Sequence, residues 1–214
     1  MPGAATAESR DVATLYAGFL VAAAIVAAIV YGLATFAIVR YRGGPADPLP
    51  VQRRGNLRLE GVWTAIPILT VLVLFAGTLV VLNRVDARTQ APVTQIHVQA
   101  FRWGWSFTYP NDGLSVSGIG DPGPEIVVPT GQAIRLTITS ADVVHSFYVP
   151  LFLFKRDAIP GRENTYEFTV TDAGTYRGQC AEFCGIYHSR MPFAIRAVSP
   201  AEYQAWVAAQ PRTP

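Results

Sequence analysis

The first 90 residues alternate between long apolar segments and short charged ones. Residues 12–39 contain no charged side chain, and neither do residues 61–83. At about 1.5 Å of rise per residue, a helix over either segment is long enough to cross a hydrocarbon core of about 30 Å. The pattern therefore predicts a transmembrane hairpin, with helices at about 12–39 and 61–83 and a loop at 40–60.

A cleaved signal sequence is the alternative interpretation of the first apolar segment. The apolar part of such a sequence spans only about 7–15 residues and follows basic residues. Here only Arg10 precedes the segment, with Glu8 and Asp11 beside it. A membrane helix is therefore favoured over a signal sequence.

The charge of the loop at 40–60 predicts how the hairpin is oriented. The positive-inside rule places an arginine-rich loop in the cytoplasm. The N-terminus and all residues after the second helix are then extracytoplasmic, on a chain that crosses the cell membrane twice. The loop has two acidic residues, Asp47 and Glu60. It carries five arginines: Arg40, Arg42, Arg53, Arg54 and Arg58.

Beyond residue 91 the apolar runs become short, β-branched or aromatic, with turn sequences between them. The runs at 134–139, 143–149, 165–170 and 193–198 have the length and composition of strands. Residues 91–214 are therefore predicted to form an all-β sandwich or barrel, separate from a hairpin domain at 1–90. A capping box predicts one short helix at the C-terminal end, from Ser199, Pro200 and Glu202.

One further run is dominated by aromatic residues at alternate positions. On a strand, alternate side chains share a face, so the pattern predicts a single strand with one aromatic face. Core packing is sufficient to explain such a face. The aromatic residues are Phe101, Trp103, Trp105, Phe107 and Tyr109.

Composition and charge exclude several classes of protein. Half of the residues are hydrophobic and only 15% are charged, which excludes a disordered chain. The net charge of +2 and the lack of a basic run mixed with aromatic residues give no support for a nucleic-acid partner. Residues 85–214 contain 10 basic and 11 acidic residues, so a strongly acidic face that would steer a basic soluble partner is not evident.

Candidate metal ligands gather in one short segment. Cys180 and Cys184 are the only cysteines, and His188 and Met191 follow them at spacings of four and three residues. A second histidine, His145, lies upstream in a predicted strand. Soft sulfur and imidazole ligands at this spacing point to a metal site.

Three interpretations of this segment compete. A disulfide suits an oxidising compartment, but it closes a very small loop and leaves His145, His188 and Met191 without a role. Zinc accepts two thiolates and two imidazoles but gives the thioether no role. Copper uses all three ligand types, often on a β scaffold, and two thiolates at this spacing can bridge two copper ions. The ligand set favours copper.

These features together resemble the cytochrome c oxidase subunit II family, with its binuclear copper A centre. The resemblance covers nearly the whole chain and implies a cupredoxin-like Greek-key barrel for the β domain. It rests on the hairpin, on the block at 180–191, and on four further motifs: Glu60-Gly61-Val62-Trp63-Thr64 with Pro67, Trp103-Gly104-Trp105, Val143-Val144-His145-Ser146-Phe147 and Asp157-Ala158-Ile159-Pro160-Gly161-Arg162.

The resemblance also implies roles for individual residues. Trp103 would be the point where electrons enter, and Glu60 would lie at the cytoplasmic mouth of a proton pathway. A structural ion pair with Arg58 is the alternative for Glu60. The carboxylate of Glu182 would bind a magnesium or manganese ion shared with subunit I. Two copper ions would be bound by His145, Cys180, the main-chain carbonyl of Glu182, Cys184, His188 and Met191.

Two positions depart from the common family pattern beside Trp103. Arg102 stands where glutamine is frequent, and Gly104 stands where many members have a larger residue. Both changes alter the surface on which an electron donor would dock.

The implied function is electron input to a proton-translocating cytochrome c oxidase. The chain would accept single electrons from a soluble or complex-bound c-type cytochrome and pass them to haem in subunit I, where oxygen is reduced to water. Subunit I, with haem and copper B, is the expected partner, together with subunit III and the lipid membrane. With His145 and His188 used as ligands, only His97 remains, so oxygen chemistry must belong to another subunit. We expect His97 to pack or to form a hydrogen bond on its strand, outside the metal site.

Two alternatives share the same sequence features. The chain could be the copper A subunit of a quinol-linked oxidase or of a nitric oxide reductase. It could also be a membrane-anchored protein that binds or delivers copper without electron transfer. The second helix, with Glu60 and Trp63, argues against the delivery protein because a simple anchor needs only one helix.

Overall fold

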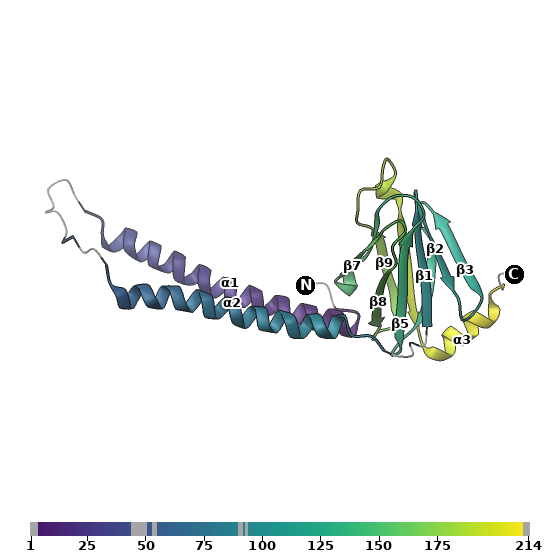
Figure 1. Cartoon of the computed structure of the whole chain (residues 1–214), viewed down its shortest axis with the longest axis horizontal. Coiled ribbons are helices and arrows are strands. Elements are labelled where there is room, and N and C mark those ends of the chain that lie inside the picture. The colour runs from purple at the N-terminus through teal and green to yellow at the C-terminus, as the bar shows by residue number, and fades with distance from the viewer. Residues whose placement is uncertain (1–3, 44–50, 53–54, 90–91, 93, 212–214) are drawn as a thin grey trace. The chain divides into compact units, whose positions relative to one another are not determined.

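The structure is a computed structural model that describes residues 4–43, 51–52, 55–89, 92 and 94–211. The described chain forms two compact units (Figure 1). One contains residues 14–81. The other contains the described residues up to Ala13 together with those from Leu82 onward. The domain division at residue 90 stays a prediction.

Two long helices form the helical hairpin, and both extend beyond their predicted bounds. Helix α1 runs from Ala7 to Arg40 and α2 from Leu57 to Val85. Both are long and apolar enough to cross a membrane, and none of the residues in their most apolar windows is buried. A core helix of a soluble protein would be covered, so these exposed apolar surfaces fit lipid or partner helices.

The helix starts explain the difference in length. At α1, Thr6 and Ser9 cap each other: each side-chain oxygen accepts the other's backbone N–H, at 2.9 and 3.0 Å. At α2, Asn56 accepts the N–H groups of Arg58 and Leu59. Because α2 begins at Leu57, Pro67 lies inside the helix.

Three of the charged residues that orient the hairpin lie outside the described residues. These are Asp47, Arg53 and Arg54. Three arginines of the same loop are described: Arg40 ends α1, Arg42 lies two residues further on, and Arg58 lies in the first turn of α2. The orientation of the hairpin across a membrane stays a prediction.

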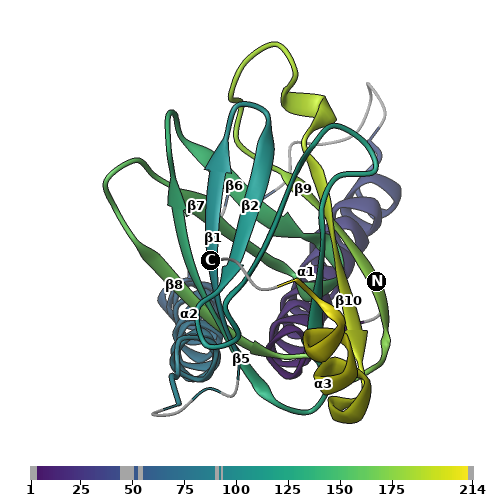
Figure 2. The ribbon, with the colours of Figure 1, turned by 90° about the vertical axis from the view of Figure 1, so that its right-hand side faces the viewer.

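The second unit contains ten strands in two five-stranded sheets (Figures 1 and 2). The strand order is β3-β2-β1-β5-β8 in one sheet and β4-β10-β9-β6-β7 in the other. The pairs β1–β5 and β4–β10 are parallel, and the remaining pairs are antiparallel. The strands are β1 Thr94–Phe101, β2 Gly104–Tyr109, β3 Leu114–Ile119, β4 Glu125–Pro129, β5 Ala133–Ser140, β6 His145–Val149, β7 Phe154–Ala158, β8 Asn164–Thr169, β9 Gly174–Cys180 and β10 Pro192–Val198.

The core lies between the two sheets and follows the period of two expected of strands. Ile134, Leu136 and Ile138 on β5 are fully buried, while the residues between them are partly exposed. Phe193 and Ile195 on β10 are buried in the same alternating way. The predicted strands at 134–139 and 193–198 are confirmed to within one residue at each end.

The aromatic run is not a single strand. It is divided by a turn at Arg102 and Trp103, so that Phe101 ends β1 and pairs with Gly104 at the start of β2. Aromatic residues at every second position are compatible with one long strand. They are equally compatible with two strands joined by a tight turn, if the turn leaves the odd-numbered side chains on the same face. The aromatic residues of β2, from Trp105 to Tyr109, do share one fully buried face.

Helix α3 (Pro200–Ala209) closes the chain as predicted. The Ser199 side chain accepts the backbone N–H of Glu202, and the Glu202 carboxylate accepts the N–H of Ser199, which is a complete capping box. Tyr203 is buried and its hydroxyl donates to Asp112 in the turn between β2 and β3, at 2.9 Å. The fold class is thus confirmed: two apolar helices, a two-sheet β domain and a short C-terminal helix.

Candidate metal centre

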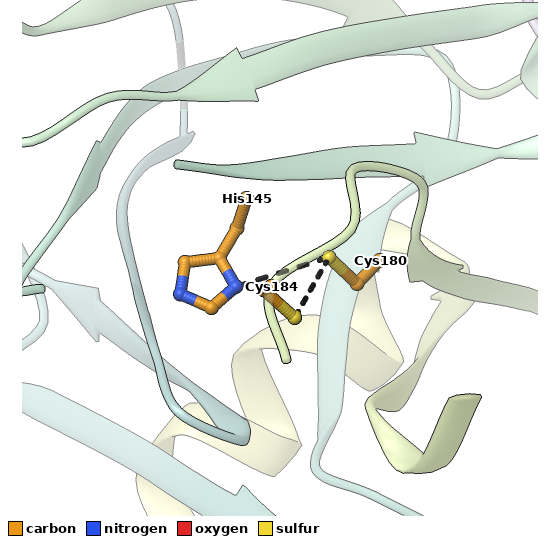
Figure 3. A group of neighbouring side chains, drawn as sticks. All are labelled: His145, Cys180 and Cys184. Atoms are coloured by element: carbon orange, nitrogen blue, oxygen red, sulfur yellow. Dashed lines mark hydrogen bonds between the residues drawn. The ribbon is translucent and has the colours of Figure 1, made fainter. Parts of the chain in front are cut away.

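Two neighbouring strands position the first candidate ligands. His145 is the first residue of β6 and Cys180 is the last residue of β9, and these strands pair through Phe147 and Cys180. The predicted strand at 143–149 therefore starts two residues later than expected. After Cys180 the chain turns back in a loop that carries Cys184 (Figure 3). This loop leads to β10.

The ligand atoms of His145, Cys180 and Cys184 converge. One atom from each residue lies within 4.8 Å of the other two, and all three residues are buried. The Nδ1 atom of His145 is 3.8 Å from the sulfur of Cys180, and the two sulfurs are 3.9 Å apart (Figure 3). Both cysteines are free thiols. A bonded pair would lie at about 2.05 Å, so the disulfide interpretation does not describe this structure.

The remaining candidates surround the two sulfurs. The Nδ1 atom of His188 is 3.5 Å from the Cys184 sulfur, and the thioether sulfur of Met191 is 4.0 Å from it. On the other side, the carbonyl oxygen of Glu182 is 3.2 Å from the Cys180 sulfur. The structure thus brings together all six groups that the sequence singled out.

A carboxylate fixes the orientation of His145. Its Nε2 atom is 2.9 Å from Oδ1 of Asp142, and a carboxylate can only accept, so Nε2 carries the proton. In the neutral ring the other nitrogen, Nδ1, then has a free lone pair facing Cys180. Such an outer carboxylate is a common support for a metal-bound histidine.

The local electrostatics favour one thiolate over two. Burial opposes ionisation of Cys180, but hydrogen bonds with His145 and the backbone lower the pKa of its thiol. Burial and the neighbouring charge on Cys180 raise the pKa of Cys184. Burial also opposes the charged form of His145, yet contacts with Cys180 and Asp142 raise its pKa. A bound metal cation would favour the ionised form of both thiols.

Trp103 lies in the turn between β1 and β2, against the outside of the ligand loop. Its indole N–H donates to the carbonyl oxygen of Cys184 at 3.3 Å, and its ring meets Tyr187 edge-on with centroids 4.9 Å apart. Gly185 has a φ of +122°, and a Cβ there would lie 3.2 Å from the indole. The loop therefore packs closely on Trp103.

Two acidic residues with predicted roles have partners in the structure. The carboxylate of Glu182 is 3.2 Å from the ammonium of Lys155, the only lysine of the chain. Glu60 accepts the backbone N–H of Asn56 at 3.2 Å and so helps to cap α2. The described residues show no ion pair between Glu60 and Arg58. His97 is exposed on the outer face of β1, away from the ligand cluster.

Sequence reasoning missed two residues of the site. Asp142 was visible three positions before His145, a short spacing that allowed a side-chain contact to be anticipated. Trp105 was assigned only to core packing. Its indole N–H donates to the carbonyl oxygen of Met191 at 3.2 Å and holds the end of the ligand loop. No local sequence pattern links Trp105 with Met191, because they are 86 positions apart.

Fold and site together define a class of protein: a β domain with a buried sulfur and imidazole site, joined to two apolar helices. Residues 121–198 match the family model for the periplasmic domain of cytochrome c oxidase subunit II. A probable cytochrome c oxidase subunit 2 of Streptomyces avermitilis is 31% identical over 243 residues, covering 95% of this chain and 76% of the relative. The chain belongs to the cytochrome c oxidase subunit II family.

Two solved structures are also similar. The periplasmic domain of subunit II of cytochrome oxidase from Bradyrhizobium japonicum is 37% identical, with a TM-score of 0.53, over 56% of this chain and 95% of that one. A mixed disulfide intermediate between a thioredoxin-like protein and subunit II of cytochrome c oxidase contains a chain that is 38% identical, with a TM-score of 0.51, over 57% of this chain and 94% of that one. Members of the family are copper-binding subunits of an oxidoreductase complex.

Proposed function

We propose that this chain is the electron-input subunit of a proton-translocating cytochrome c oxidase. It would accept single electrons from a c-type cytochrome and pass them to haem in subunit I, where oxygen is reduced to water. One observation carries the proposal: two free thiols, two imidazoles, a thioether and a carbonyl oxygen surround one buried point of the β domain.

The donor set fits two copper ions. Thiolate, imidazole and thioether are ligands that copper prefers, and hard cations such as magnesium do not. His145, Cys180, Cys184, His188, Met191 and the carbonyl of Glu182 would hold the pair. When bound, the copper ions would supply a one-electron redox site whose charge is shared over both sulfurs.

The protein's own residues would keep this site dry and rigid. His145 is fully buried, and Met191 is 1% exposed. Asp142 would hold His145 with its Nδ1 lone pair toward the sulfurs, and Trp105 would hold the carbonyl of Met191. Trp103 would give electrons a route inward, because its indole N–H already contacts the peptide of Cys184.

Glu182 would serve two metals with two different groups. Its carbonyl faces the sulfurs, while its carboxylate points to Lys155. We propose that the carboxylate binds magnesium or manganese at the contact with subunit I. The ion would then take the place that the ammonium of Lys155 holds in this chain alone.

The hairpin would anchor the subunit beside subunit I, with subunit III as a further partner. In this arrangement the β domain and the N-terminus lie outside the cytoplasm of a membrane that the chain crosses twice, and residues 1–90 form the anchor. Glu60, at the start of α2, would lie at the cytoplasmic mouth of a proton pathway. Its contact with Asn56 supports a helix-capping role as well.

The proposal is tested by metal analysis of the full chain purified in detergent. We expect two copper ions per chain and an electron paramagnetic resonance spectrum of one unpaired electron shared by two copper nuclei. Cys180→Ser should abolish that spectrum, and His188→Gln should abolish it while His97→Gln leaves it unchanged. A single-copper spectrum would point to a copper-delivery protein, and a chain that takes up no copper would contradict the proposal.

A further inference from the structure

A short segment at the start of α1 is built into the β domain. Ala5 is 6% exposed, and Thr6 and Ser9 are fully buried. Ala5 belongs to the same apolar core as the residues between the two sheets, and the whole segment groups with the β domain. Threonine and serine are mostly exposed in folded proteins. Residues 5–10, which we call the N-terminal strap, are therefore a structural part of this domain.

The first two residues of the strap pair with the chain on both sides. The N–H of Ala5 donates to the carbonyl oxygen of Leu151 at 3.2 Å, and the N–H of Thr171 donates to the carbonyl oxygen of Ala5 at 3.1 Å. Thr6 and Val170 form an antiparallel bridge. The strap thus begins as a minimal strand between the segment after β6 and the segment after β8.

The strap also covers part of an open sheet edge. β8 is the last strand of its sheet, and the outer backbone groups of an edge strand are open to pairing with other chains. Here the N–H of Thr169 donates to the carboxylate of Glu8 at 3.1 Å. Arg10 donates to the hydroxyl of Thr171 at 2.9 Å and pairs with Asp172 at 3.3 Å. Side chains of the strap therefore continue the cover that its backbone begins.

The strap contacts the far ends of the two strands that carry the first metal ligands. Leu151 follows β6, which begins with His145. Thr171 precedes β9, which ends with Cys180. Each contact thus lies at the opposite end of its strand from the ligand. Release of the strap should therefore loosen the β domain without removing a ligand.

The partners of the strap are distant in the sequence. Glu8 and Thr169 are 161 positions apart, and both long helices lie between them. We propose that the strap is a latch: the β domain reaches full stability only when the segment before α1 lies on the same side of the membrane. This inference rests on the proposed function, in which α1 and α2 form a membrane-crossing hairpin. Stable folding of the metal domain then follows export of the strap.

The first test compares two substitutions in the full chain purified in detergent. Ala5→Glu places a carboxylate at the buried position, and Ala7→Glu adds the same charge where the side chain is exposed. Hydrogen exchange is followed by mass spectrometry in peptides that cover residues 5–13 and 164–173. Because a buried unpaired charge is expelled, we expect exchange at least about ten-fold faster in Ala5→Glu. Ala7→Glu should exchange like the unchanged chain.

A milder variant keeps the test valid if Ala5→Glu does not fold. Thr171→Val removes a hydroxyl that donates to the Ala5 carbonyl at 3.2 Å and accepts from Arg10, and it adds no charge. Loss of these bonds should speed exchange of the strap about three-fold. Thr175→Val is the matched control, because Thr175 is an exposed residue of β9. The copper spectrum of Thr171→Val should equal that of the unchanged chain.

The second test locates the strap in sealed right-side-out membrane vesicles. An epitope tag precedes Met1 of the full chain, and protease is added from outside. We expect the tag to be digested and the β domain to resist. A run of arginines after the tag should hold the N-terminus inside, and a run of glutamates in the same place is the control. In chains whose tag stays protected, the exposed β domain should be digested.

Three results would overturn the inference. One is equal exchange in the Ala5→Glu and Ala7→Glu chains together with no effect of Thr171→Val. Another is a protease-resistant β domain in chains whose tag is protected. The third is a protected tag in the unchanged chain, which would also reverse the orientation of the hairpin. Failure of the copper site is distinct, because the exchange measurements are made without copper: a chain with a working latch that binds no copper would contradict only the proposed metal centre.

Discussion

Replacing Asp142 by asparagine should loosen His145 without changing the size of the side chain. Oδ1 of Asp142 accepts the N–H of Val143 at 2.6 Å and faces Nε2 of His145 at 2.9 Å. Oδ2 accepts the backbone N–H of Arg102 at 2.8 Å. An amide turns one of these oxygens into an NH₂ donor. Whichever way the amide turns, its NH₂ group faces an N–H donor: those of Val143 and His145 on one side, or that of Arg102 on the other.

The lost hydrogen bonds set the size of the effect. Leaving a buried donor without an acceptor costs about 1–3 kcal/mol. Because the Asp142 side chain is 25% exposed, water replaces part of that loss, and we expect the free energy of unfolding to fall by about 2 kcal/mol. Outer partners of metal-bound histidines change metal affinity by about 10–100-fold, so copper should bind at least about ten-fold more weakly.

Two assays on the full chain in detergent check this prediction. Copper affinity is measured by competition with a chelator, and stability by urea unfolding followed through tryptophan fluorescence. Asp172→Asn is the matched control, because Asp172 forms an exposed ion pair with Arg10 at 3.3 Å and should change stability by less than about 1 kcal/mol. If Asp142→Asn binds copper and unfolds like the unchanged chain, Asp142 does not orient His145.

Three further changes probe the β domain by urea unfolding. Tyr109→Phe should cost about 1–3 kcal/mol, because the buried hydroxyl both donates to the Val127 carbonyl at 2.9 Å and accepts its N–H at 3.0 Å. Gly104→Ala should cost about 1–3 kcal/mol, since its Cβ would clash with the carbonyl oxygen of Gly118 on β3. Burial opposes ionisation of Glu167, but hydrogen bonds from Thr89 and Arg135 outweigh the effect of burial and lower the pKa of the Glu167 carboxyl. The ionised carboxylate therefore stabilises the fold above the ordinary pKa of 4.5, and this stabilisation is lost as the pH falls below that value. Glu167→Gln should flatten stability against pH in that acid range, and an unchanged slope would contradict the assignment.

The sequence predicted most accurately what depends on local spacing. The ligands from Cys180 to Met191 lie within one loop, so their residue types and intervals alone pointed to a metal site. The capping box at Ser199 and the two uncharged segments at 12–39 and 61–83 are local in the same sense. Each rests on residues a few positions apart, where backbone geometry restricts which side chains can meet.

What the sequence did not predict depends on contacts between distant segments. Thr6 at the start of α1 pairs with Val170 beyond β8, which draws the first residues of the helix into the unit of the β domain. The pairing of Lys155 with Glu182 joins β7 to the ligand loop in the same way. Neither pairing has a local pattern, because each depends on which strands become neighbours.

The ligand loop shows why one short segment can serve two purposes. Its inward residues, Cys184 and Met191, are 6% and 1% exposed, while Phe183 and Ile186 on its outer side are 79% and 80% exposed. The inward positions are constrained by the sulfur and imidazole cluster, whereas the outer side chains are mostly exposed, and of the two the Phe183 ring lies 5.8 Å from the ring of His188. Substitutions on the inner side should therefore change metal binding, and substitutions on the outer side should change partner binding with the metal centre intact. Trp103 belongs to both sides, because it is partly exposed and its indole N–H donates to the loop backbone.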